Sequence, residues 1–265
     1  MKDYTTISVV QDGAVDWLTL NRPERLNALN GTMVRELWSY FDGLESDYSR
    51  RVVVLRGAGR GFCAGLDLTW FNEPGAVMPR GATDAGPGPS LAEIVRKMRA
   101  CPQAIVALIH GAACGGGFNL ALAADIRLAG RSAKMNVAFI KLGLSGCELG
   151  TSYFLPRMLG TSVAAELMMT GRFIHADRAL ATGLVSEVVD DDQLEAAGRA
   201  LVADLLAASP MGLRKTKEVM TRASEMEDLT AVIALEEHTQ LACMQAGSFA
   251  PTVAASTRQG TTVAG

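Results

Sequence analysis

The hydrophobic residues of this chain fall into short continuous runs that alternate with amphipathic segments. Two runs, Val52–Leu55 and Ile105–Ile109, are rich in Val and Ile and are soon followed by a glycine, which is typical of buried strands. Between residues 32 and 48, apolar side chains recur at helical spacing after Asn30, a residue type that caps helices. This alternation predicts an α/β fold in which helices cover a mixed or parallel sheet.

The two ends of the chain depart from this alternation. Near the start, Ile7–Val10 and Val15–Leu20 flank an Asp12-Gly13 pair, which favours a β-hairpin. After about residue 193 only helical patterns remain, and they cover Leu194–Ala208, Pro210–Ala223 and Leu229–Gln245. We therefore predict a core at residues 1–192 and a helical region at residues 193–265 that docks on a neighbouring subunit.

Residues 72–90 and 248–265 contain few apolar residues and little periodicity. The first stretch is rich in Gly and Pro, and its length favours a lid or pocket wall over a simple connection. The second stretch consists of small and polar residues, so we expect it to fray.

Composition and charge exclude several classes of protein. With 25 Lys and Arg against 28 Asp and Glu, the chain lacks the basic surplus of a nucleic-acid-binding protein. No apolar run is long enough to span a membrane, and the first residues lack the apolar stretch of a signal peptide, so we expect a cytoplasmic protein. The five cysteines form no Cys-x-x-Cys pair, which argues against a disulfide framework or a bound metal.

Two glycine-rich segments carry the chemistry. Phe62–Leu68 (FCAGLDL) and Cys114–Asn119 (CGGGFN) each follow one of the buried strands. Glycine lets backbone N–H groups face a cleft because no Cβ blocks the approach. Two such turns can direct two donors at one oxygen, the geometry that stabilises an oxyanion. The pattern therefore indicates an enzyme of acyl transfer or enolate chemistry.

Four segments in this order resemble the enoyl-CoA hydratase/isomerase (crotonase) family. They are Asn21–Leu29 (NRPERLNAL), Phe62–Leu68, Gly115–Ala129 (GGGFNLALAADIRLA) and Gly143–Arg157. The resemblance extends to about residue 190. It implies a crotonase-like spiral of ββα units with a helical C-terminal trimerisation region. It also implies an acyl-CoA thioester as substrate, no metal or redox cofactor, and a homotrimer or dimer of trimers.

The resemblance assigns residues to an oxyanion hole and a CoA site. The oxyanion donors are the backbone N–H groups of Leu66 and Gly116, although these glycine-rich turns could instead serve tight strand–helix packing. Arg25 occupies the position that meets the CoA phosphates; a solvated surface arginine is the other interpretation. The segment that borders the adenine and pantetheine matches Ala64, Asp67 and Leu68.

The catalytic acids of typical hydratases in the family are missing. The two positions that carry Glu in those enzymes match Asn119 and Phe139, which then border the substrate. If one residue is inserted near Ser145, Glu148 matches the Asp of the family's dienoyl-CoA isomerases. A lone carboxylate can move a proton between two carbons, so the resemblance favours isomerisation over hydration. Alternatively, Glu148 is a structural residue beside the helix expected near Gly150.

Three other interpretations stay open. The missing acids are compatible with a catalytically silent acyl-CoA binding protein or with a hydratase whose acids are displaced. Gly59–Gly65 is also a near miss of the G-x-G-x-x-G dinucleotide motif, with Ala64 in place of the third glycine, which leaves a nucleotide-dependent oxidoreductase as a weaker hypothesis.

Overall fold

The computed structural model describes residues 3–69 and 89–246 and divides the chain into two compact units, Met1–Val202 and Ala203–Gly265. Most of the predicted loop at 72–90, and the predicted frayed end at 248–265, lie outside the described residues. In the part of the chain that the structure describes, no helix has the length and apolar character needed to cross a membrane.

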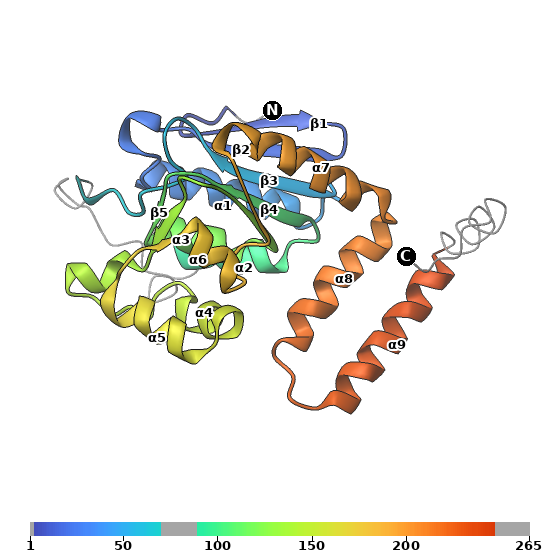
Figure 1. Cartoon of the computed structure of the whole chain (residues 1–265). Helices are drawn as coiled ribbons and strands as arrows, with labels where there is room; N and C mark the ends of the chain where they lie inside the picture. The colour runs from blue at the N-terminus through green and yellow to red at the C-terminus, as the bar shows by residue number, and fades with distance from the viewer. Residues whose placement is uncertain (1–2, 70–88, 247–265) are drawn as a thin grey trace. The chain divides into compact units, whose positions relative to one another are not determined.

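A six-stranded sheet, with strand order β1-β2-β3-β4-β6-β9, forms the centre of the first unit (Figure 1). Its strands are β1 (Ile7–Asp12), β2 (Val15–Leu20), β3 (Val52–Gly57), β4 (Ala104–Ile109), β6 (Ile126–Gly130) and β9 (Glu187–Val189). β1 and β2 are antiparallel, with Asp12 opposite Val15, so the predicted hairpin is confirmed. The other neighbours are parallel.

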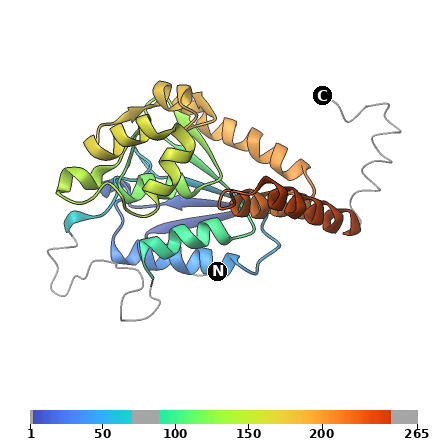
Figure 2. The ribbon, with the colours of Figure 1, turned by 90° about the horizontal axis from the view of Figure 1, so that it is seen from below.

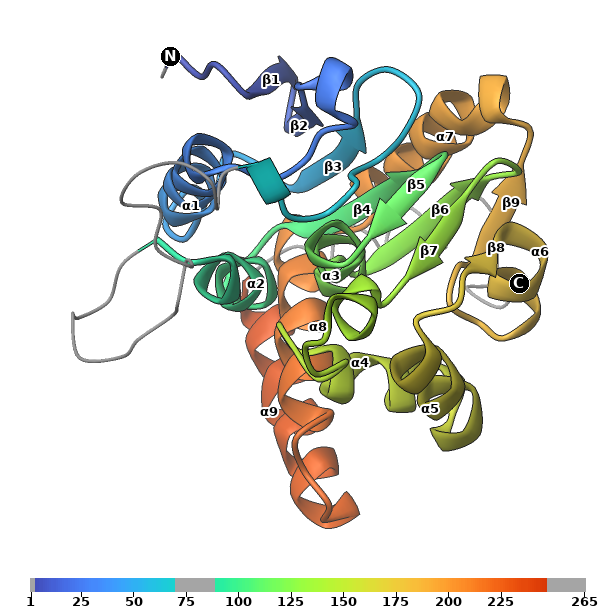
Figure 3. The same cartoon turned by 90° about the vertical axis from the view of Figure 1, so that its left-hand side faces the viewer.

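Both faces of this sheet are covered. Val53 and Leu55 of β3 belong to the main hydrophobic core, together with residues of α1 (Gly31–Leu44) and α2 (Leu91–Ala100). On the opposite face, a Cβ added to Gly198 of α7 would lie 2.8 Å from Cδ1 of Leu108. Figure 3 shows α1 and α2 on one side of the strands and α7 on the other. Burial on both faces explains why these strands are continuous apolar runs.

A second, three-stranded sheet has the order β5-β7-β8. Its strands are β5 (Ala112–Cys114), β7 (Lys134–Asn136) and β8 (Ile174–His175). β4, β5 and α3 (Gly116–Ala123) follow one another as a strand–strand–helix unit. None of β5, β8 and β9 is longer than three residues, which is too short for hydrophobic periodicity to predict.

Two helices of the first unit, α1 and α2, begin at residues whose side chains cap them. The Asn30 side chain accepts a hydrogen bond from Met33 N at 2.9 Å, and Ser90 accepts one from Glu93 N at 3.1 Å. α1 and α2 pack side by side (Figure 2). The remaining helices of this unit are α4 (Thr151–Leu159), α5 (Thr161–Thr170), α6 (Ala176–Ala181) and the start of α7 (Leu194–Ala207).

The predicted end of α1 near Tyr48 is wrong, since the helix ends at Leu44. The Asp47 carboxylate accepts hydrogen bonds from both N and Oγ of Ser49. Such local side-chain bonds compete with a continuing helix and form a turn.

The second unit is helical in its described part. It contains the end of α7, then α8 (Pro210–Ala223) and α9 (Leu229–Gln245). Pro210 stands at the start of α8, as the pattern predicts, and the Ser209 side chain caps the helix by accepting a hydrogen bond from Gly212 N. α8 and α9 contact each other as a helical hairpin.

Candidate active site

The two glycine-rich segments run side by side as extended backbone. Phe62 N donates to His110 O at 2.8 Å, Cys63 N to Ala112 O at 2.9 Å, and Cys114 N to Cys63 O at 2.9 Å. This pairing is parallel, like that of β3 and β4, and it follows the carboxyl ends of those strands with the register shifted by two residues, since Cys63 lies opposite Ala113. The topology thus brings together two motifs that are about fifty residues apart in the sequence.

The peptide between Gly65 and Leu66 is oriented by its carbonyl. Gly65 O accepts a hydrogen bond from Leu29 N at 2.7 Å. Because a trans peptide points its C=O and N–H in opposite directions, the N–H of Leu66 points away from Leu29. Gly65 has φ +94°, and a Cβ there would lie 2.6 Å from Cys114 O and 3.6 Å from Gly116 N. The turn that carries Leu66 N–H therefore approaches the Gly116 amide closely.

Gly116 is the first residue of α3, so its N–H has no acceptor within the helix. The positive end of the helix dipole adds to this donor. Around it lie apolar side chains: a Cβ at Gly116 would be 2.7 Å from Leu91, 3.0 Å from Leu29 and 4.0 Å from Leu149. Gly117, the next residue, has a packing role instead. At Gly117 a Cβ would be 2.4 Å from Cys63 O, so this glycine serves close packing.

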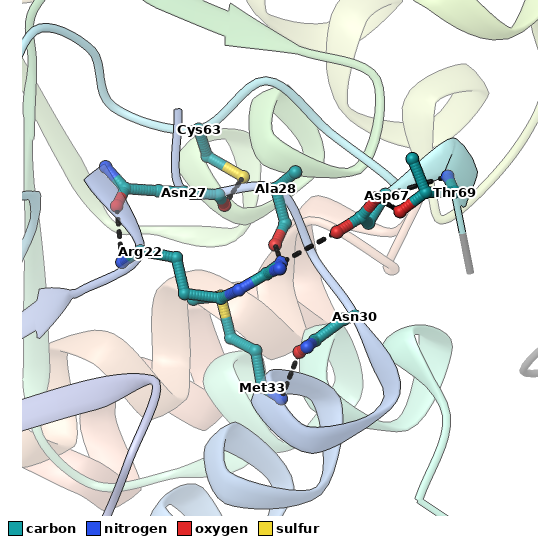
Figure 4. Close-up of polar contacts among 8 residues, drawn as sticks. All are labelled: Arg22, Asn27, Ala28, Asn30, Met33, Cys63, Asp67 and Thr69. Carbon is teal, nitrogen blue, oxygen red and sulfur yellow. Dashed lines mark hydrogen bonds and ion pairs between the residues drawn. The ribbon is translucent and has the colours of Figure 1, made fainter. Parts of the chain in front are cut away.

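Asn27, which sequence reasoning missed, connects the first motif to the second (Figure 4). This buried residue has φ +56°, a left-handed conformation that Asn tolerates better than most residues. Its Nδ2 donates to Ala58 O at 2.8 Å and to Gly61 O at 2.9 Å. The Cys63 thiol donates to Asn27 O at 3.0 Å, and burial raises the pKa of that thiol to about 12. The signal in the sequence was an Asn in a short irregular segment, which alone does not specify such bonds.

Asp67 pairs with Arg22, a second residue that sequence reasoning missed (Figure 4). Nη1 of Arg22 lies 2.9 Å from Oδ2 of Asp67 and also donates to Ala28 O at 2.6 Å. Oδ1 of Asp67 accepts from N and Oγ1 of Thr69. Burial alone would raise the pKa of this carboxyl, but the bonds from Thr69 and Arg22 outweigh it and lower the pKa. Both carboxylate oxygens of Asp67 are thus bonded within the protein, to Arg22 and to Thr69. Contact of Asp67 with CoA stays a prediction.

The other residues assigned to the CoA site lie in the same two segments, Asn21–Leu29 and Phe62–Leu68. Arg25 ends the short 3₁₀ helix Pro23–Arg25 and is exposed. Ala64 N donates to Leu26 O at 2.9 Å, which joins the two motifs. Leu68 is 51% exposed, so its side chain is available for contact.

The two positions of the missing hydratase acids are buried. Phe139, in the 3₁₀ helix Ala138–Leu142, lies beside the first glycine of the GGG turn: a Cβ at Gly115 would be 3.6 Å from its ring. Asn119 Nδ2 faces Glu148 O and Leu149 O, each at 3.2 Å, and Thr151 Oγ1 at 2.8 Å. The amide of Asn119 therefore contacts the turn that carries Glu148.

Glu148 is exposed and lies immediately before a tight turn into α4. Its carbonyl accepts hydrogen bonds from N and Oγ1 of Thr151. The next residue, Leu149, is the one whose Cδ1 lies close to Gly116. The carboxylate is thus carried by a turn that borders Gly116. Among residues 3–69 and 89–246, no three His, Cys, Asp or Glu side chains gather as metal ligands.

The chain is similar to known proteins over most of its length. A family model described as enoyl-CoA hydratase/isomerase matches residues 11–255. A probable enoyl-CoA hydratase of Mycobacterium bovis is 39% identical over 230 residues, which cover 84% of this chain and 79% of that protein. The 1,2-epoxyphenylacetyl-CoA isomerase of Escherichia coli K12 is 36% identical over 242 residues, which cover 88% of each.

A solved structure resembles the chain over most of its length. A protein of Thermobifida fusca YX, determined in complex with acetoacetyl-CoA, matches with a TM-score of 0.78 and 31% identity, covering 91% of this chain and 95% of that one. This likeness confirms the predicted crotonase-like α/β fold, whereas trimerisation stays a prediction.

Proposed function

The chain belongs to the enoyl-CoA hydratase/isomerase family, and we propose that it moves a proton between two carbons of an enoyl-CoA thioester, with Glu148 as the only catalytic carboxylate. One observation carries the proposal. The amide of Asn119 is bonded to the Glu148–Thr151 turn and Phe139 is packed against Gly115, so neither position offers a carboxylate to water.

Hydration and isomerisation make different demands on the site. Addition of water needs one group to hold and deprotonate the water and another to protonate the α-carbon. Isomerisation needs one base that removes a proton from the α-carbon of a 3-enoyl thioester and returns it to the γ-carbon. The exposed carboxylate of Glu148 suffices for the second reaction. The 1,2-epoxyphenylacetyl-CoA isomerase among the relatives supports an isomerase in this part of the family.

The backbone donors supply the electrostatic part of the mechanism. We place the thioester oxygen between Leu66 N–H and Gly116 N–H, where negative charge develops as the enolate forms. Each such donor contributes about 3 kcal/mol to the stabilisation of an oxyanion. The apolar side chains of Leu29, Leu91 and Leu149 around Gly116 exclude water and strengthen these bonds.

We further propose that Arg25, Ala64, Asp67 and Leu68 form the CoA site, because the two segments that carry them are hydrogen-bonded to each other beside Leu66. The complex of the Thermobifida fusca protein with acetoacetyl-CoA supports a CoA thioester as the ligand. Calorimetry with butanoyl-CoA tests this: binding should weaken at least fivefold in Arg25→Ala. The matched control is Arg35→Ala, a change on α1 outside the motif. Equal affinities would remove Arg25 from the site.

The central experiment measures three reactions in the wild type, in Glu148→Gln and in the control Glu187→Gln, which changes an exposed glutamate on β9. They are isomerisation of 3-hexenoyl-CoA, hydration of crotonyl-CoA, and exchange of the α-hydrogen of butanoyl-CoA with D₂O. We expect isomerisation and exchange in the wild type and in Glu187→Gln, and a loss of at least a hundredfold in Glu148→Gln.

Two other functions would give different results. A hydratase, as the name of the Mycobacterium bovis relative suggests, would hydrate crotonyl-CoA rapidly, and hydration that survives Glu148→Gln would show that other acids act. A silent acyl-CoA binding protein would bind butanoyl-CoA without exchanging its α-hydrogen.

Association into a homotrimer or a dimer of trimers is part of the proposal. The described helices α8 and α9 expose five large apolar side chains, which are Met220, Leu229, Ile233, Leu241 and Met244. A helical hairpin with so many exposed apolar residues is suited to a subunit contact. Light scattering at micromolar concentration tests this, and a stable monomer would contradict it.

A further inference from the structure

The turn that carries Glu148 has an unfavourable backbone conformation. Leu149 has φ +52° and Gly150 has φ +84°, two consecutive residues in the left-handed region. A residue with a branched side chain such as Leu rarely adopts this conformation, and it persists only where the surroundings impose it. Hydrogen bonds from neighbouring side chains must therefore hold this turn.

The surroundings that impose it are two side chains, Asn119 and Thr151. Asn119 Nδ2 contacts the carbonyl oxygens of Glu148 and Leu149, each at 3.2 Å. Thr151 Oγ1 donates to Glu148 O at 2.6 Å and accepts from Asn119 Nδ2 at 2.8 Å. The carbonyl of Glu148 is thus bonded from both side chains, which fixes the backbone on either side of Leu149.

The chemistry of these partners determines which end of the Asn119 amide faces the turn. Carbonyl oxygens only accept hydrogen bonds, and the Thr151 hydroxyl already donates its hydrogen to Glu148 O. All three partners therefore require a donor, and only the NH₂ end of the amide provides one. An ionised carboxylate at position 119 would instead face two carbonyl oxygens that cannot donate, and a hydroxyl that could donate to it only by giving up its bond to Glu148 O.

Asn119 also shares a helix with the oxyanion donor. Gly116 and Asn119 are three residues apart in α3, so they lie on the same face of the helix. Every residue of α3 is buried, which makes the helix a rigid connection. Helix α3 thus carries the Gly116 N–H at its first residue. Three residues later, the Asn119 side chain bonds to the Glu148 turn.

We propose that Asn119 is a positioning residue: through the Glu148–Gly150 turn it sets the location of the Glu148 carboxylate relative to the Gly116 N–H. This inference rests on the proposed function, because it gives Glu148 the role of the base. It has a second consequence. Replacing Asn119 by the glutamate of ordinary hydratases does not create a hydratase, since the new carboxylate repels the turn and displaces Glu148.

The principal test is Asn119→Asp, which keeps the shape and removes the amide donor. At pH 8 we expect kcat for isomerisation to fall at least tenfold, while KM and the affinity for butanoyl-CoA change less than twofold. As the pH is lowered from 8 to 6, the ratio of variant to wild-type kcat should rise, because burial at this 1% exposed position raises the pKa of the introduced carboxyl group, which regains a donor when it is protonated. A ratio that does not depend on pH would contradict the proposal.

Thr151 gives an independent test if Asn119→Asp does not fold. Thr151→Val should lower kcat at least fivefold, and Thr151→Ser, which keeps the hydroxyl, should restore it to within twofold of the wild type. Asn119→Glu should lose isomerase activity and gain no hydratase activity. Retained isomerase activity together with new hydratase activity in that variant would overturn the proposal.

Gln103→Glu is the matched control for losing a buried amide donor. Gln103 is fully buried before β4, and its Nε2 donates to Leu44 O and Asp47 O, at the end of the strands opposite the site. This variant should lower thermal stability and leave kcat unchanged. If Asn119→Asp keeps wild-type kcat at pH 8 while Glu148→Gln loses activity, only the positioning role fails. If Glu148→Gln is fully active, the proposed function and the positioning role both fail.

Discussion

Replacing Asn27 by alanine tests how strongly the Asn21–Leu29 segment is held to residues 58–61, which precede the Phe62–Leu68 segment. The Asn27 side chain makes three short hydrogen bonds, all at 2.8–2.9 Å. Its Nδ2 donates to Ala58 O and Gly61 O, and its Oδ1 accepts from Arg22 N. The residue is 0% exposed, so water cannot replace these partners in the variant.

The expected loss of stability follows from these contacts. Each buried hydrogen bond contributes about 1 kcal/mol, so their loss lowers the free energy of unfolding by about 3 kcal/mol. Alanine at φ +56° adds about 1 kcal/mol, because it lacks the polar side chain that makes Asn tolerant of the left-handed region. The total is about 4 kcal/mol, a large fraction of the stability of a typical domain.

Urea unfolding followed by tryptophan fluorescence measures this change. The matched control is Asn30→Ala in the same segment, where one cap bond to Met33 N is lost and about 1 kcal/mol is expected. A loss in Asn27→Ala that is no larger than that in Asn30→Ala would refute the reasoning, because the two asparagines would then contribute alike despite their different numbers of buried bonds.

Three further predictions concern the same loops. Gly117→Ala should lower the melting temperature by several degrees, since its Cβ would lie 2.4 Å from Cys63 O, whereas Gly43→Ala, which meets nothing within 4 Å, should not; calorimetry of both variants decides. The lowered pKa of Asp67 means that its contribution to stability is complete above the ordinary carboxyl pKa and is lost as the pH falls through the folded-state pKa. Urea midpoints between pH 6 and 3 should therefore fall more steeply in the wild type than in Arg22→Met, and parallel curves would contradict the pairing. Iodoacetamide at pH 8 should modify the exposed Cys147 and leave the buried Cys63 unmodified, since the raised pKa of Cys63 keeps it a thiol; peptide mass spectrometry checks this, and early modification of Cys63 would contradict its burial.

Much of the secondary structure could be predicted from the sequence, because its determinants are local. The hairpin at Asp12-Gly13, the cap Asn30, and the helices α8 and α9 all follow from residues within one or two turns of each other. The order of the four motifs was also sufficient to identify the family resemblance, which the comparisons confirm. The end of α1 was wrong because a side-chain turn at Asp47 competes with the helix.

The sequence by itself determined the elements, their order and which residue types were available for chemistry. Only the tertiary structure decided how those residues are used. The short strands β5, β8 and β9 exist through pairing with distant segments, not through any pattern of their own. Likewise, Arg22 meets Asp67 across 45 residues, and Asn119 meets Thr151 across 32. A side chain's partners are set by which backbone atoms the fold brings within about 3 Å of it. Local sequence cannot specify that distance, so the hydrogen-bond partners of Asn119 are decided only by the fold, which places α3 beside the Glu148 turn.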